Sequence, residues 1–123
     1  MTNKHKFRIN QGSDVSISIV VKDCEGTPVN FTGFLFRMQL RRFYSSKNVD
    51  DELRSDDKES RIVVDPENGQ FTLIFPNEVT KKLSGSYLYD IETTSPDGRV
   101  DRLLQGSISI SPEVTREDES EET

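Results

Sequence analysis

The stretch from residue 85 to residue 112 constrains the fold most strongly, because two long alternating segments are joined there by one tight turn. In the first segment every second residue is large or β-branched, which is the period of a half-buried strand. These residues are Tyr87, Tyr89, Ile91 and Thr93. The Ser95-Pro96-Asp97-Gly98 that follows has the residue types that a type I turn prefers. The stretch therefore predicts a long β-hairpin, which needs further strands to cover its apolar face.

The return strand of this hairpin is predicted to bury four apolar side chains, those of Val100, Leu104, Ile108 and Ile110. Leu103 interrupts the polar pattern of the opposite face. Gly106 lies in mid-strand, where a glycine indicates either a β-bulge or a closely approaching neighbour.

Several shorter stretches have the pattern of strands, and the clearest is the alternation of residues 15–21. The other predicted strands are residues 4–10, 34–42, 61–65 and 70–75. Residues 77–83 are the one helical candidate, 43–60 are predicted to be a long polar loop, and 113–123 form an acidic tail. Short strands at turn spacing with one small helix predict an all-β protein. We expect an immunoglobulin-like antiparallel β-sandwich of about seven strands, with residues 1–112 as its single domain.

The charge balance bears on the partners of the protein. The formal net charge of the 123 residues is −6, which disfavours binding to nucleic acid or to an anionic membrane surface. No segment has the roughly 18 consecutive apolar residues that a membrane span needs. The single cysteine, Cys24, cannot form a disulfide within the chain and is read as a small residue near a strand end.

The sequence offers little that could support catalysis. It has one histidine and one cysteine, and it lacks a nucleophile elbow, a phosphate-binding glycine loop and zinc-ligand spacing. Asp90 and Glu92 form a carboxylate pair, but Arg99 and Arg102 are expected opposite them, so ion pairs are favoured over a glycosidase site. We therefore expect no enzyme activity, no cofactor, no bound metal and no small-molecule substrate.

Candidate partner-binding residues fall into three groups. Arg37, Arg41 and Arg42 form a basic strip at the outward positions of one predicted strand, where an acidic neighbour could bind as an alternative to solvent. The terminal segments are opposite in charge and could serve as contact arms: Lys4, Lys6 and Arg8 on one side, and Glu113, Arg116, Glu117 and Asp118 on the other. Tyr44, next to Phe43 at the start of the polar loop, is a candidate for stacking on a carbohydrate.

The order of motifs resembles a family of small immunoglobulin-like virion proteins of tailed bacteriophages, and also the N-terminal domain of baseplate upper proteins. The resemblance covers about residues 7 to 116. Its most specific pieces are Pro28-Val29-Asn30-Phe31-Thr32-Gly33, Tyr87-Leu88-Tyr89-Asp90 and Ser95-Pro96-Asp97-Gly98.

This resemblance implies a non-enzymatic structural protein of the virion, made in the host cytoplasm. It would dock at the tail, baseplate or neck, with other virion proteins and further copies of itself as partners. A capsid decoration protein and a free host-surface carbohydrate-binding module are the alternatives.

Overall fold

Residues 3–56 and 60–112 are described by a computed structural model of the chain, which is mostly β-strand. The strands are β1 (Asn3–Asn10), β2 (Val15–Val20), β3 (Leu35–Arg41), β4 (Asp51–Arg54), β5 (Ile62–Asp65), β6 (Gln70–Phe75), β7 (Gly85–Thr94) and β8 (Val100–Ser111). A 3₁₀ turn, η1 (Pro66–Asn68), joins β5 to β6, and a short helix, α1 (Asn77–Thr80), follows β6.

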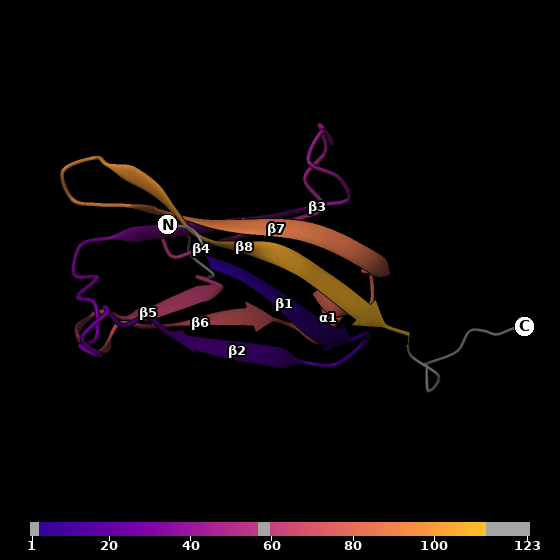
Figure 1. Cartoon of the computed structure of the whole chain (residues 1–123). Coiled ribbons are helices and arrows are strands. Elements are labelled where there is room, and N and C mark those ends of the chain that lie inside the picture. The colour runs from indigo at the N-terminus through magenta and orange to yellow at the C-terminus, as the bar shows by residue number, and fades with distance from the viewer. Residues whose placement is uncertain (1–2, 57–59, 113–123) are drawn as a thin grey trace, which may run out of the picture.

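Two β-sheets pack face to face as a sandwich (Figure 1). The larger sheet has the strand order β1-β8-β7-β3-β4, and the smaller has the order β2-β6-β5. All the pairings are antiparallel except that of β1 with β8, which is parallel. The predicted all-β sandwich is therefore confirmed, with one parallel pair at an edge of the larger sheet.

The core fills the space between the sheets with the inward side chains that the alternating pattern predicted. β3 contributes Phe36, Met38 and Leu40, and β6 contributes Phe71, Leu73 and Phe75, each no more than 1% exposed. The Phe36 ring of the larger sheet lies 4.9 Å, centroid to centroid, from the Phe71 ring of the smaller sheet. Such tilted aromatic contacts add to the hydrophobic stabilisation of the interface between the sheets.

The predicted hairpin is formed by β7 and β8, and the Gly98 N–H donates to the Ser95 carbonyl across its turn, at 2.9 Å. The prediction that Val100 is buried was wrong, because Val100 is 58% exposed. Ile91 pairs with Leu104 but Glu92 pairs with Arg102, so Leu103 is an extra residue in β8. One extra residue inverts the alternation beyond it, which turns Val100 to the opposite face.

Gly106 allows β1 to approach β8 closely. A Cβ atom built on Gly106 would lie 1.8 Å from the His5 carbonyl oxygen, so only glycine fits there. The close neighbour, one of the two predicted reasons for Gly106, is therefore the one observed, while the bulge lies three residues earlier. The Tyr89 hydroxyl also donates to the His5 carbonyl, at 2.8 Å, and burial raises the pKa of this phenol.

The prediction of an uninterrupted polar loop over residues 43–60 was wrong, because β4 forms within it and pairs with β3. β4 has a single core residue, Leu53, which is fully buried, and the other three residues of the strand are polar. One inward side chain is too little periodicity to reveal a strand in sequence. The helix is also shorter than predicted, although Leu83, beyond its end, is buried.

Candidate interaction surface

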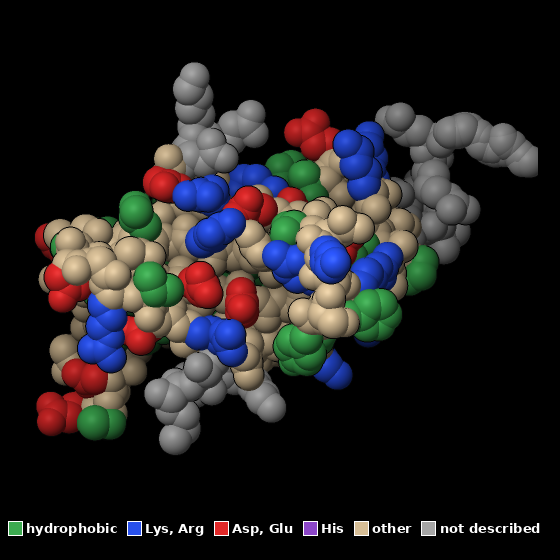
Figure 2. Space-filling view, turned by 90° about the horizontal axis from the view of Figure 1, so that it is seen from above, with side chains coloured by type: hydrophobic (Ala, Val, Ile, Leu, Met, Phe, Trp, Pro, Cys, Tyr) green, Lys and Arg blue, Asp and Glu red, His purple; other side chains and the backbone are tan. Residues whose placement is uncertain are grey.

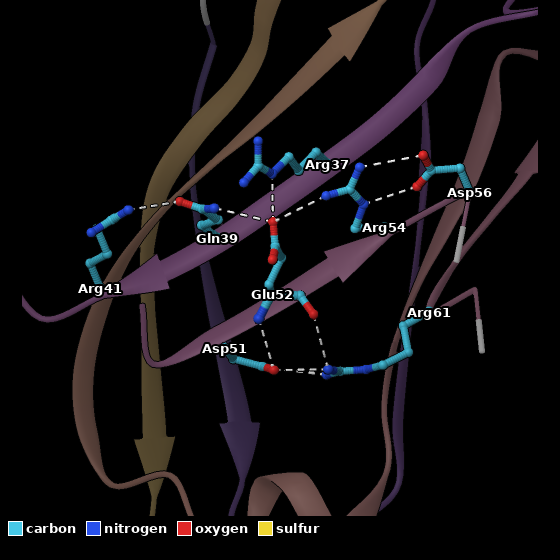
Figure 3. Close-up of polar contacts among 8 residues, drawn as sticks. All are labelled: Arg37, Gln39, Arg41, Asp51, Glu52, Arg54, Asp56 and Arg61. Atoms are coloured by element: carbon cyan, nitrogen blue, oxygen red, sulfur yellow. Dashed lines mark hydrogen bonds and ion pairs between the residues drawn. The ribbon is translucent and has the colours of Figure 1, made fainter. Parts of the chain in front are cut away.

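A polar network covers the outward side of β3 and β4 (Figure 3). The Glu52 carboxylate accepts hydrogen bonds from Arg37 Nε and from Gln39 Nε2, and Arg54 Nη1 lies 3.8 Å away. The hydrogen bond from Arg37, followed by that from Gln39, lowers the pKa of Glu52 below its ordinary value. Arg54 also pairs with Asp56, at 3.0 Å, and lowers the pKa of that carboxyl group in turn. The network therefore favours ionised carboxylates between arginines.

A second ion pair links the two sheets. Arg61, just before β5, donates through Nη1 and Nη2 to the two oxygens of Asp51 in β4, both at 2.8 Å. Both side chains are largely buried, at 15% and 12% exposure. Arg61 Nε also donates to the Ile74 carbonyl at 3.0 Å, so one guanidinium group holds β4 against β6.

The predicted basic strip is largely satisfied by groups of the same chain. Arg41 donates to the Ser46 carbonyl at 2.7 Å and to Gln39 Oε1 at 2.9 Å. The guanidinium carbon of Arg42 lies 4.1 Å from the centre of the Tyr87 ring, which is a cation–π contact. Arg42 Nη1 also donates a hydrogen bond to the Ser86 carbonyl. Figure 2 shows acidic side chains interspersed with basic ones over the outer face of the larger sheet. Binding of the strip to an acidic neighbour stays a prediction.

Two exposed aromatic side chains flank a hollow on this face. Phe43 is 68% exposed and Tyr44 is 81% exposed, in a segment after β3 that rises from the larger sheet (Figure 1). The Ser46 N–H donates to the Phe43 carbonyl at 3.1 Å and closes a turn there. The hollow has a volume of about 210 Å³ and is also lined by Arg41 and Asp90. Tyr44 and Arg41, both predicted from sequence, therefore line one site.

The ion pairs expected on the hairpin form in part. Arg102 Nε lies 3.5 Å from Asp90 Oδ2, as predicted across the strands. Arg99 instead forms an ion pair with Asp101 of β8, two residues further along the chain, at 3.2 Å. The expected pairing of Arg99 with Asp90 or Glu92 of β7 was therefore wrong. The position of Arg99 explains this, since it lies in the turn before β8 begins.

The basic residues of the first strand lie apart from the aromatic site. Lys6 and Arg8 are exposed on β1, and β8 and β7 lie between β1 and β3. Lys4 is opposite Gln105 in the β1–β8 register. The tail candidates Glu113, Arg116, Glu117 and Asp118 lie outside the described residues.

A cleft between the sheets was missed by the sequence reasoning. It opens between β1 and β2, has a volume of about 690 Å³, and is lined by apolar residues that include Phe7, Ile17, Ile19 and Leu103. The only signal for it in the sequence was Leu103, an apolar residue out of step with its strand.

Within residues 3–56 and 60–112, no group of three or more His, Cys, Asp or Glu side chains is placed to hold a metal ion. No helix of the described chain is long and apolar enough to cross a membrane.

No protein-family model matches the chain, and no curated protein matches it. Among solved structures, the chain is similar to CopC from Methylosinus trichosporium OB3b, whose crystal structure gives 14% sequence identity and a TM-score of 0.48. The match covers 90% of this chain and 88% of that one.

Proposed function

We propose that this chain is a non-enzymatic structural component of a tailed-phage virion, which docks at the tail, baseplate or neck through its sheet edges and terminal arms. The observation that carries the proposal is the open side of the sandwich. There β1 and β2, the edge strands of the two sheets, flank a cleft of about 690 Å³ whose lining is mixed: Phe7, Ile17 and Ile19 lie beside the polar residues His5, Ser18 and Lys22. Unpaired edges beside apolar surface are sites where β-proteins add a neighbour.

The directions of the strands support contact arms that reach other proteins. Because β1 and β8 are parallel, Lys4 and Ser111 lie at opposite ends of the pair. Ser111, the last residue of β8, therefore lies at the end of the sandwich remote from Lys4, where the Gln11 N–H donates to the Ser111 carbonyl at 2.9 Å. The predicted basic arm is itself a paired strand, since Lys6 and Arg8 lie on β1, so its exposed side chains rather than a free segment would meet the acidic tail of a neighbouring molecule.

The test is electron microscopy of whole particles from the source lysate, with gold-labelled antibody raised against this chain. Label at the tail, baseplate or neck is the expected result. Label over the head would replace the proposal with a capsid decoration role. Particles without label would refute a virion role altogether.

The hollow beside Tyr44 favours a second candidate, a carbohydrate-binding module. An aromatic side chain that is 81% exposed above polar side chains resembles a sugar-stacking site. A glycan array separates the two functions. Binding that is lost in Tyr44→Ala but kept in Val63→Ala, another exposed apolar position, would favour the carbohydrate role.

A further inference from the structure

The open edge of β2 differs from the three other sheet edges of the described chain. β4 and β5 have only four residues each, and β1 carries Lys6 and Arg8 at exposed positions. Short edges and edge charges are the usual protections against pairing with another chain. β2 has six residues, and its exposed positions are Ser16, Ser18 and Val20, none of them charged. β2 is therefore the least protected edge.

The backbone N–H and C=O groups of Ser16, Ser18 and Val20 point to the free edge of β2, on the side away from β6. The Ile74 N–H donates to the Arg61 carbonyl at 2.8 Å, so Ile74 is directed towards the β5 side. Ile74 is opposite Ser16 in the β2–β6 register, and Ser16 must then direct its own N–H and C=O to the free edge. Ser18 and Val20 direct their N–H and C=O groups to the same free edge, because alternate residues of a strand point their backbone groups to the same side.

The order of side chains along β2 is self-complementary. When two copies of β2 are placed antiparallel with Ser18 opposite Ser18, Ser16 comes opposite Val20, and the inward residues Ile17 and Ile19 come opposite each other. Each pair formed by Ser16, Ser18 and Val20 can exchange two N–H···O=C bonds, because these residues carry the outward backbone groups.

Charge selects this register over its neighbours. Asp14 and Lys22 flank β2 and are both exposed, and the two-fold arrangement centred on Ser18 places Asp14 of one copy opposite Lys22 of the other. The Asp14 carboxylate also accepts hydrogen bonds from the Asn77 N–H, at 2.7 Å, and from Asn77 Nδ2, at 3.4 Å, so its attraction to Lys22 adds to contacts that it already makes. A shift by two residues in either direction keeps the inward and outward faces but places Asp14 opposite Val20 or Cys24. Opposite charges across a strand pair favour the register that aligns them.

From these observations we propose that two copies of this chain pair through β2 about a two-fold axis at Ser18, which joins their smaller sheets into one continuous sheet. The half-buried side chains of Ile17 and Ile19 in one copy then lie beside those of the other, next to the cleft. This inference deepens the proposed assembly function, because it names one edge and one partner, and it rests on the proposal that the protein acts by assembly.

The test is site-specific disulfide cross-linking in a Cys24→Ser background, since Cys24 is exposed. Ser18→Cys places two thiols opposite each other across the axis, at about the 5.5 Å Cα separation of a hydrogen-bonded pair, which a disulfide can span. Ser16→Cys is the matched control. Its two thiols would be four residues apart along the strands, about 13 Å, which is beyond the reach of a disulfide.

We expect a dimer in sedimentation velocity for the unmodified protein, and rapid oxidation of Ser18→Cys, but not of Ser16→Cys, to a covalent dimer. Ser18→Pro should weaken dimerisation about tenfold or more with the fold retained, because the Ser18 N–H serves only the free edge. A monomer at all concentrations, or equal cross-linking of the two cysteine variants, would overturn the proposal. Neither result affects the labelling of virions, so failure of the pairing and failure of the virion role can be distinguished.

Discussion

Replacing Arg61 by alanine removes the ion pair that links the two sheets. The guanidinium group donates to both oxygens of Asp51, to the Glu52 carbonyl at 3.3 Å and to the Ile74 carbonyl at 3.0 Å. Without it the Asp51 carboxylate, which is 12% exposed, has lost its paired cation. A charge left unpaired in a buried position costs more free energy than the lost attraction alone.

The size of the effect follows from this burial. Removing one partner of a buried pair costs about 3–5 kcal/mol, and the partial exposure of both groups favours the lower end of that range. We therefore expect the free energy of unfolding of Arg61→Ala to fall by about 3 kcal/mol. For a domain of this length, the midpoint of thermal unfolding should fall by about 10 °C.

The assay is urea unfolding followed by circular dichroism, combined in a double-mutant cycle with Asp51→Ala. The cycle should give a coupling energy of about 2 kcal/mol, because the second truncation removes the unpaired charge. Arg99→Ala is the control. Its pair with Asp101 is exposed at 76% and 59%, and its loss should cost under about 0.5 kcal/mol. Additive effects of Arg61→Ala and Asp51→Ala would refute the reasoning.

Three further predictions concern the larger sheet. Gly106→Ala should destabilise the protein by about 3 kcal/mol or more in urea unfolding, because the new Cβ would occupy the place of the His5 carbonyl; unchanged stability would contradict that close approach. Tyr89→Phe should cost about 1 kcal/mol in the same assay by removing the hydrogen bond to the His5 carbonyl, and a cost near zero would show that water replaces it. Folding lowers the pKa of Glu52 below its ordinary value of 4.5. The ionised carboxylate therefore stabilises the fold fully at pH values above 4.5, and this stabilisation is lost as the pH falls through the lowered pKa of the folded state. Thermal unfolding from about pH 5 down to about pH 3 should therefore show a smaller loss of stability in Glu52→Gln than in the wild type, and identical pH profiles would argue against that pKa shift.

The strands that sequence predicted correctly each bury several side chains at a period of two. β7 does so with Tyr87, Tyr89 and Ile91, which are at most 4% exposed. Such strands carry their own signal, because burial of one face fixes the alternation. β4 carries almost none, since Leu53 alone faces the core, and its pairing with β3 depends on contacts such as that of Glu52 with Arg37 across the strands.

The candidate surfaces were less accessible from sequence, because they depend on register and on contacts between distant segments. Arg37, Arg41 and Arg42 were predicted on one strip, yet each uses its charge within the chain, and only the three-dimensional arrangement reveals those partners. The exposure of Tyr44 was inferred from its polar surroundings, which is a local property. The parallel pairing of β1 could not be read locally, since β8 lies about a hundred residues away along the chain.

The pairing of β1 with β8 also determines when β1 can join its sheet during synthesis of the chain. Chains emerge from the ribosome with the N-terminus first, at about 5–20 residues per second. Asn3–Asn10 therefore waits without its sheet neighbour until the segment that ends at Ser111 has emerged. The contact closes a very long loop, and contacts of that kind slow folding. The first strand to be made is thus among the last to take its place, and until then the edge of β8 with Gly106 is open to any other extended segment in reach.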